Sequence, residues 1–301
     1  MKISNPGKVY FPGEGITKGD LVAYHREIAS SMLPFLRDRP LVLTRFPDGI
    51  LGKSFFQKDA PTWRPGWIRT VTVHAEEANR DLAHFLVDDA DGLAWLINLG
   101  VIPIHVFSSR APSLERPDWC ILDLDPKEAP FAHVIQLARA VRALCEELGL
   151  PSFPKTTGQK GLHVLLPLGG QLTHEQSRTL GELLARAVEA ELPEISSTAR
   201  AIPARRGRVY LDYLQNGYGK TIAAPYTVRP RAGAPVSTPL RWSEVGPRLD
   251  PSRFTIRNVR ARADRLGADP LAPVLTLRPD LLTALTRLSE RVEGAGAGAG
   301  R

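Results

Sequence analysis

Hydrophobic and polar positions repeat with two different periods along this chain, and these periods separate predicted helices from predicted strands. Residues 131–148 carry apolar side chains at helical spacing, and Gly149 supplies a stop signal. Thr173 and Gln176 form a capping-box signature at the start of a long helix, and Thr17 caps an earlier one. The pattern predicts helices over residues 18–36, 79–86, 91–99, 131–148, 173–192, 251–263 and 279–293.

Short apolar or alternating runs between these helices predict the strands. They cover residues 41–46, 53–58, 68–74, 103–107, 119–125, 152–155, 162–166 and 209–214. This mixture of strands and helices predicts an α/β or α+β fold. The chain becomes Pro-rich and irregular between 226 and 239, and Gly alternates with Ala at its end. We therefore expect one catalytic domain over residues 1–293, with sub-lobes not separable from sequence, and a flexible tail over 294–301.

Composition narrows the class of protein. The 301 residues are 43% hydrophobic and 24% charged, which is typical of a well-packed soluble chain. The formal charge of +7 favours a phosphate-rich partner such as nucleic acid, although arginine-rich composition can also follow codon bias. The only two cysteines, Cys120 and Cys145, predict buried thiols in a reducing compartment. We expect no secretion signal, no membrane span and a cytoplasmic location.

Three aspartates on predicted strands are the first candidates for chemistry. Asp123 and Asp125 are two residues apart on one strand and therefore point to the same face. Pro126 ends that strand, and Asp212 lies on a later apolar strand. Asp-x-Asp also occurs in turns and helix caps, so this spacing alone leaves the alternative open. Three neighbouring carboxylates would suit two hard divalent cations, Mg²⁺ or Mn²⁺, and phosphoryl or nucleotidyl transfer.

A glycine-bracketed loop lies between the two aspartate strands. Gly158 and Gly161 flank a tight turn whose backbone N–H groups can approach a phosphate closely. Thr157 adds a hydroxyl, Lys160 adds a charge, and His163 begins the next strand. The loop is no P-loop, because the Gly-Lys-Ser/Thr ending is absent and a strand follows. An ordinary turn between two strands is the alternative interpretation.

Taken in order, these motifs resemble a known family. Asp-Leu-Asp-Pro, Thr-Gly-x-x-Gly-x-His and Tyr-Leu-Asp-Tyr are similar to the polymerase domain of bacterial ATP-dependent DNA ligase D, a member of the archaeo-eukaryotic primase superfamily. The resemblance extends from about Asn5 to about Arg248 and also allows a stand-alone member. It implies two mixed β-sheets flanked by helices, with the active site in a cleft between them.

The resemblance also implies roles for individual residues. Asp123, Asp125 and Asp212 match the metal-binding triad, with Asp212 also a candidate to activate the primer 3′-hydroxyl. Residues that match positions at or near the bound triphosphate are His105, Thr157, Gly158, Lys160, Gly161, His163, Lys220 and Arg229. Many members carry serine where this chain has Thr157, a change that keeps the hydroxyl.

Five further residues match DNA contacts of that family. Phe55 and Phe56 match an aromatic pair that stacks on template bases, and Arg45 precedes that pair in a family-like turn. We expect one of the two rings to be buried in the core, because neighbouring residues on a strand point to opposite faces. Lys8 and Lys18 match lysines that bind the 5′-phosphate of the downstream strand, and two solvated surface lysines are the alternative.

The sequence therefore predicts a DNA-dependent nucleotidyltransferase that extends a 3′-hydroxyl at short gaps or broken ends in non-homologous end joining. The resemblance further implies use of Mn²⁺ and a preference for ribonucleotides. A Ku-like end-binding protein and a DNA ligase are candidate partners. Alternatives left open are a non-catalytic module that recognises DNA ends, an Asp-x-Asp glycosyltransferase that uses a nucleotide sugar, and a true primase.

Overall fold

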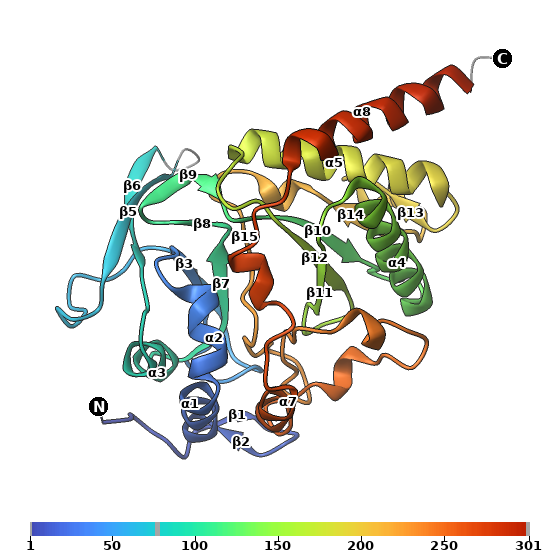
Figure 1. The fold of residues 1–301 in the computed structure, drawn as a ribbon. Helices are drawn as coiled ribbons and strands as arrows, with labels where there is room; N and C mark the ends of the chain where they lie inside the picture. The colour runs from blue at the N-terminus through green and yellow to red at the C-terminus, as the bar shows by residue number, and fades with distance from the viewer. Residues whose placement is uncertain (1, 76–78, 299–301) are drawn as a thin grey trace.

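The computed structural model describes residues 2–75 and 79–298, which fold around two β-sheets (Figure 1). The first sheet has five strands in the order β11 (Phe153–Thr156), β12 (Leu162–Pro167), β10 (Trp119–Asp125), β14 (Val209–Asp212) and β13 (Ser196–Ser197). Its strand pairs are antiparallel, except that β13 runs parallel to β14.

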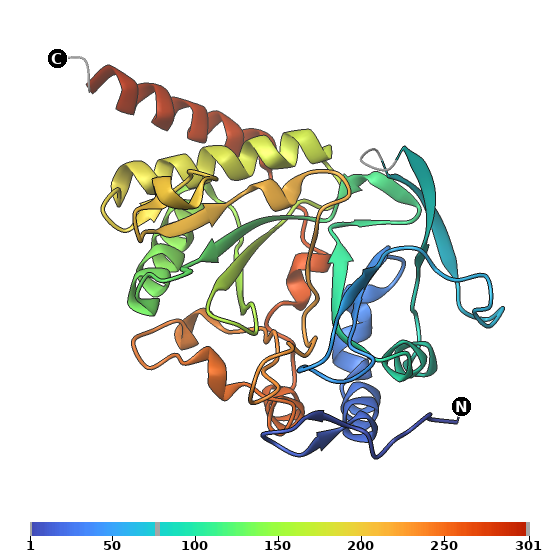
Figure 2. The same ribbon diagram turned by 180° about the vertical axis from the view of Figure 1, so that it is seen from behind.

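Helices cover one face of this first sheet and leave the opposite face for the site. They are α4 (Phe131–Leu148), α5 (His174–Glu191) and α8 (Leu281–Gly298), which lie together on one side of the sheet in Figures 1 and 2. Cys120, Leu122 and Leu124 of β10 are packed in the core that these helices form. On the opposite face, Trp119 and Ile121 are buried in a second hydrophobic core, and the site lies further along β10. Because side chains alternate along a strand, Asp123 and Asp125 point to the face without these helices.

The second sheet contains six strands. Five follow the order β15 (Thr221–Ala223), β7 (Val101–Phe107), β3 (Leu41–Arg45), β6 (Arg80–Phe85) and β5 (Thr70–Ala75), and β4 (Phe55–Gln57) pairs with β3. A separate hydrophobic core joins this sheet to α1 (Lys18–Glu27), α2 (Ala29–Leu36) and α3 (Ala90–Asn98). Two small hairpins complete the β structure, β1 (Val9–Phe11) with β2 (Ile16–Thr17) and β8 (Ser109–Arg110) with β9 (Ser113–Pro117).

Residues 224–241, directly after β15, form no helix and hydrogen-bond to strands of both sheets. Thr156 of β11 donates its backbone N–H to the carbonyl of Thr238, and Ala224 donates to Ile104 of β7. The remaining short elements are α6 (Ile202–Arg205), η2 (Leu214–Asn216), η3 (Trp242–Glu244), η4 (Pro251–Arg253), α7 (Val259–Leu266) and η5 (Ala272–Leu275). This segment therefore ties the two sheets together next to the site.

Several predicted elements differ from the structure. The predicted helix over residues 79–86 is wrong, because this segment is strand β6, which pairs with β5 from Thr70↔Phe85 to Ala75↔Arg80. Ladder hydrogen bonds and burial of Leu82 and Phe85 outweigh the helix propensity of its residues. The predicted helix over 18–36 is interrupted at Ile28, which ends α1 and caps α2.

The end of the chain also differs in one respect. Helix α8 continues to Gly298, past the predicted helix end at residue 293 and into the stretch predicted as a flexible tail. The division into one domain and a tail otherwise stays a prediction. Within residues 2–75 and 79–298, none of the helices combines the length and apolarity needed to cross a membrane. Cys120 and Cys145 are buried and unpaired, as predicted.

Candidate active site

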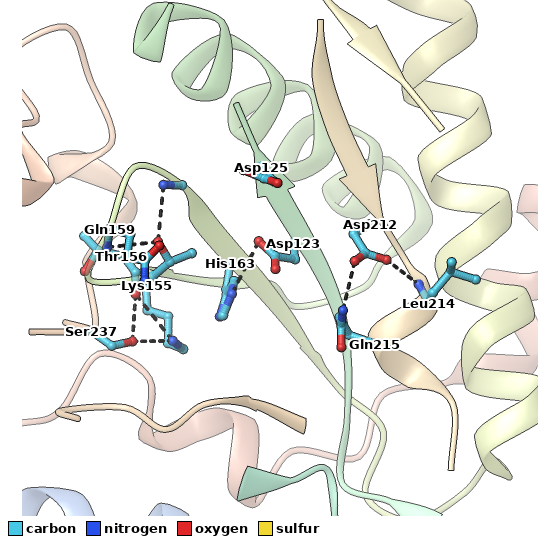
Figure 3. A network of polar contacts seen from close by, with 12 residues as sticks. Asp123, Asp125, Lys155, Thr156, Gln159, His163, Asp212, Leu214, Gln215 and Ser237 are labelled. Atoms are coloured by element: carbon cyan, nitrogen blue, oxygen red, sulfur yellow. Dashed lines mark hydrogen bonds and ion pairs between the residues drawn. The ribbon is translucent and has the colours of Figure 1, made fainter. Parts of the chain in front are cut away.

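The three predicted aspartates lie on one face of the first sheet. Asp123 of β10 is directly opposite Asp212 of β14, and Asp125 is two residues further along β10. Directly opposed side chains of an antiparallel pair lie on the same face, with Cβ atoms about 5 Å apart. Figure 3 shows the three carboxylates around the end of β10. The structure thus brings together the residues that sequence order alone could not place side by side.

Each carboxylate has a different environment. Asp212 is partly buried, and its two oxygens accept hydrogen bonds from the Leu214 N–H (2.8 Å) and from Gln215 Nε2 (2.9 Å). Burial raises the pKa of Asp212, the two hydrogen bonds lower it, and the nearby charge of Asp123 raises it further. Asp125 is 53% exposed and lies 3.8 Å from Nη1 of Arg205. These surroundings leave Asp125 the most accessible of the three to solvent.

The three aspartates provide the kind of ligand atoms that hard divalent cations prefer. All three side chains supply carboxylate oxygens, and the repulsion that raises the pKa of Asp212 is relieved when a cation sits between such groups. Their orientation is not that of a formed site: Asp212 is turned toward Gln215, and Asp123 lies 3.4 Å from Nε2 of His163. Among the described residues, no three His, Cys, Asp or Glu side chains are grouped closely enough to hold an ion as they stand.

His163 continues the row of polar residues across the sheet. On β12 it is opposite Asp123, and on the far side it is opposite Lys155 of β11. Burial lowers the pKa of His163, Lys155 lowers it further, and Asp123 opposes both effects. The imidazole is therefore a neutral hydrogen-bonding group at neutral pH, and its Nδ1 has no protein partner among the described residues.

The glycine loop is fixed by its own hydrogen bonds and by close backbone contacts. Thr157 Oγ1 accepts from the N–H groups of Gln159 (3.1 Å) and Gly161 (3.2 Å). A Cβ on Gly161 would lie 2.4 Å from the carbonyl oxygen of Leu124, and Gly158 has φ +69°. Glycine is thus required at both ends of the loop, and the Thr157 hydroxyl orders the loop from inside.

A cleft of about 440 Å³ joins these groups to the second sheet. It is lined by His105, Asp123, Asp125, Lys127, Thr157, Gln159, Lys160, Gly161, His163, Gln215, Thr221, Ile222, Ala223, Arg229 and Arg231. Eight predicted site residues are in this lining, and Asp212, Gly158 and Lys220 are not. Lys220 lines an adjoining groove of about 990 Å³ that shares Gln215 and Thr221 with the cleft and also contains Phe56.

His105 and Arg229 line this cleft together with Asp123 and Asp125. His105 belongs to β7 of the second sheet, and burial, followed by the charge of Arg229, lowers its pKa to about 3. Burial lowers the pKa of Arg229 to about 10, while Asp123 opposes that change. Arg229 keeps its charge at neutral pH, and its Nε has no partner among the described side chains and backbone. A cationic group thus shares the cleft with the carboxylates of Asp123 and Asp125.

Both predicted template-stacking residues are exposed. Phe55 is 46% and Phe56 is 71% exposed, so the expectation that one ring is buried in the core is wrong. Within the described part of the chain, neither ring belongs to a hydrophobic core, and β4 lies beside β3 outside the main path of the sheet. The Arg45 guanidinium lies 5.2 Å from the centre of the Phe55 ring. Phe56 lies 6.4 Å, centre to centre, from the His105 ring and so borders the cleft.

The two predicted 5′-phosphate lysines lie next to one another. The backbone N–H of Lys18 donates to the Lys8 carbonyl (2.9 Å) at the start of α1. The Lys18 ammonium is buried and donates to Ser4 Oγ (2.7 Å), while Lys8 pairs with Asp48 (2.6 Å). Burial lowers the pKa of Lys18, and the positive charges of Lys8 and Arg45 lower it further. The positive charges of Lys8 and Arg45 therefore lie close enough to Lys18 to disfavour its charged form, and the role of the two lysines stays a prediction.

Several residues of the site were missed by the sequence reasoning. Gln215 donates a hydrogen bond to Asp212, and Arg205 lies 3.8 Å from Asp125. Lys155 is buried beside His163. Gln215 had a detectable signal, because it follows Asp212 by three residues within a turn. No sequence signal marked Lys155 as buried, because a lysine in a short apolar strand normally lies at the edge of a sheet. Other missed cleft residues are Lys127, Gln159 and Arg231.

Comparison with known proteins shows which family this chain matches. Residues 17–271 match the family described as LigD, primase-polymerase domain. The chain is 33% identical over 269 residues to the bifunctional non-homologous end joining protein LigD of Bacillus subtilis, covering 89% of this chain and 43% of that protein. It is 32% identical over 289 residues to the multifunctional protein LigD of Pseudomonas aeruginosa, covering 95% of this chain and 34% of that protein.

A solved structure agrees in fold. The polymerase domain of Mycobacterium tuberculosis ligase D, in complex with DNA, superposes with a TM-score of 0.86 at 30% sequence identity. The match covers 93% of this chain and 99% of that chain. The fold of two sheets with a central cleft is therefore confirmed. The chain spans less than half the length of the two LigD proteins it matches.

Proposed function

Since this chain belongs to the LigD primase-polymerase domain family, whose members are nucleotidyltransferases, we propose that it extends DNA 3′-hydroxyls at gaps or double-strand break ends during non-homologous end joining. The observation that carries this proposal is the row of Asp212, Asp123 and His163 across three neighbouring strands, beside a cleft that Asp123 and His163 share with Arg229. Carboxylates and cations in one cleft suit a metal-bound triphosphate.

The three aspartates are proposed as the metal ligands of the reaction. Asp123 and Asp125 would hold two ions, Mn²⁺ or Mg²⁺, and Asp212 would share one of them next to the 3′-hydroxyl. When bound, such ions stabilise charge on the attacking and leaving oxygens of an in-line displacement. The raised pKa of Asp212 agrees with this assignment, because burial, and to a smaller extent the charge of Asp123, disfavours its carboxylate form, which a neighbouring cation would stabilise.

The other polar residues of the cleft are proposed to bind the triphosphate. Arg229 and Lys160 provide positive charge, and His163 and His105 provide neutral ring N–H groups. Thr157, Gly158 and Gly161 keep the loop tight enough for Lys160 to project into the cleft. Lys220, in the adjoining groove, would interact with the nucleotide from the second sheet. Preorganised donors of this kind stabilise the charge that develops in the transition state.

Two surfaces are proposed to bind DNA. Phe55 and Phe56 would stack on template bases beside the cleft, with Arg45 supporting Phe55. Lys8 and Lys18 would bind a 5′-phosphate on the downstream strand. A buried ammonium that donates to a neutral hydroxyl, as Lys18 does to Ser4, is a strong candidate for binding an external anion, because an uncompensated buried charge is costly.

We infer the pathway and partners of this chain from its relatives. The LigD proteins named above are non-homologous end joining proteins, so we propose cooperation with a Ku-like end-binding protein and a DNA ligase, in the cytoplasm of a bacterial cell. Preference for ribonucleotides is part of the same proposal. It can be measured by comparing ATP, GTP, CTP and UTP with their deoxy forms.

Primer extension on a one-nucleotide gap with Mn²⁺ tests this function. We expect templated addition that increases when the downstream strand carries a 5′-phosphate. Asp125→Ala should abolish addition and leave DNA binding largely intact, since the metal ligand is lost while the DNA surfaces remain. Glu194→Ala, which removes an exposed carboxylate outside the cleft lining, is the matched control. Tight DNA binding without any addition by the unaltered protein would favour a non-catalytic end-recognition module instead.

A further inference from the structure

Lys155 is a buried lysine at the inner end of the row of polar residues. It lies opposite His163, which lies opposite Asp123, which lies opposite Asp212, so four adjacent strands each contribute one residue to the row. The Lys155 side chain is fully buried. Its Nζ donates to Ser237 Oγ (2.5 Å) and, at 3.4 Å, to the carbonyl of Thr156 (Figure 3). The amine therefore sits behind the cleft wall rather than in it.

The acceptors around Lys155 are neutral. Within the described residues, no carboxylate lies at ion-pair distance from its Nζ, as the ion pairs of the chain involve other groups. The charged and titratable groups that face it are Arg229, Asp123, His163 and His105. Burial lowers the pKa of Lys155 to about 7, Arg229 contributes in the same direction, and only Asp123 opposes them. The protein alone thus leaves this amine without a full counter-charge.

A triphosphate in the cleft would supply that counter-charge. Arg229 and His163 line the cleft and are two of the groups that interact electrostatically with Lys155, so an anion held by them would also act on the amine. We propose that Lys155 is a positioning residue for the nucleotide, and that it takes up a proton from solvent when a nucleoside triphosphate binds. This inference rests on the proposed nucleotide binding. The step forms one N–H bond and involves no other covalent change.

The direction in which pH changes nucleotide affinity follows from the linkage between protonation and binding. Below pH 7 the free protein already carries the charged amine, so nucleotide affinity is highest there and no proton is taken up. Between pH 7 and the higher pKa of the complex, binding must add a proton, and affinity falls by up to about tenfold per pH unit. Charged Lys155 would also add a positive charge beside His163, which lines the cleft.

Calorimetry of nucleotide binding tests this directly. The Mn²⁺ complex of a methylene-bridged ATP, which cannot react, is titrated into primer-free protein at pH 8 in buffers of different ionisation enthalpy. Proton uptake by the unaltered protein should approach about one proton per nucleotide, because the amine is neutral before binding and charged afterwards. Lys155→Met, of similar size and without charge, should show no such uptake. Lys53→Met removes an exposed lysine and is the control.

A second variant keeps the test decisive if Lys155→Met folds poorly. Ser237→Ala removes an acceptor of the ammonium, so the pH at which uptake is half-maximal should move downward. Equal proton uptake by the unaltered protein and Lys155→Met, or by the unaltered protein and Ser237→Ala at every pH, would overturn the role of Lys155. Absence of any nucleotide binding by the unaltered protein would instead overturn the proposed function and this inference with it.

Discussion

Single residues decide the shape of the loop beside the aspartates. Gly161 approaches the carbonyl of Leu124 so closely that no larger residue fits, and its N–H donates to Thr157 Oγ1. The glycine is therefore needed for a close approach of two backbone segments, β10 and the loop. This approach brings Lys160 to the same cleft as Asp123 and Asp125.

We predict that Gly161→Ala weakens nucleotide binding at least tenfold. The added Cβ would lie 2.4 Å from the Leu124 carbonyl oxygen, so the loop or the strand end must move, at a cost of about 1–3 kcal/mol. Titration with a fluorescent nucleotide measures the affinity. Gly66→Ala, where an added Cβ meets nothing within 4 Å, should bind as the unaltered protein does. Unchanged affinity in Gly161→Ala would contradict the role given to the loop.

The residues of the site were predictable to different degrees. Asp123, Asp125 and His163 could be identified because strand alternation and a glycine turn leave a local signature in sequence. Their alignment with Asp212 depends on the pairing of strands about 90 residues apart, which the local pattern does not encode. The burial of Lys155 depends on Ser237, which belongs to an irregular segment without periodicity.

At the scale of elements, helix α1 carries a buried histidine within its apolar face. His25 is fully buried in the second-sheet core, and its Nδ1 lies 2.7 Å from the carbonyl of Leu21. Burial lowers the pKa of His25 to about 4, and the backbone hydrogen bond opposes this only in part. The folded protein therefore holds His25 neutral, whereas the unfolded chain protonates it near pH 6.5.

We predict that His25 contributes to acid lability of this fold. Between about pH 6.5 and pH 4 the unfolded state binds the extra proton, so the free energy of unfolding falls as pH falls, by up to about 1.4 kcal/mol per unit. His25→Leu should weaken this dependence of the free energy of unfolding on pH, measured by urea denaturation across that range. His74→Leu, at an exposed histidine, should leave the dependence nearly unchanged. An equally steep dependence in His25→Leu would assign the acid lability to other groups.

Elements were predicted well where one strong local signal dominated. Strand β10 and helix α4 match their predicted ranges because an apolar run and a helical repeat end at Pro126 and Gly149, respectively. Strand β6 was mistaken for a helix, because Asp81, Ala83 and the adjacent Leu82 do not form a strong β pattern. The segment is a strand because it pairs with β5, which is a tertiary interaction.

At the scale of the whole molecule, the site is built where two separate cores meet. The aspartates and the glycine loop belong to the first sheet, while His105 and Phe56 belong to the second. Arg229 comes from the irregular segment between them, where its N–H donates to the carbonyl of Pro235 (2.7 Å). Sequence periodicity predicted most strands of both sheets, but not β6, β13 and β15, and not which strands share a sheet. The arrangement of two sheets around a cleft came from family resemblance alone.

A ligand in this cleft must contact both halves of the fold, so we predict that nucleotide binding stabilises the protein as a whole. Saturation at 100 times the dissociation constant should raise the free energy of unfolding by about 2.7 kcal/mol, seen as a higher Tm in the presence of Mn²⁺ and a non-reacting nucleotide. Lys160→Ala removes an exposed charge from the cleft and should lose most of this shift while keeping the ligand-free Tm. Lys53→Met should keep the full shift. An undiminished shift in Lys160→Ala would mean that the nucleotide binds elsewhere than between the two sheets.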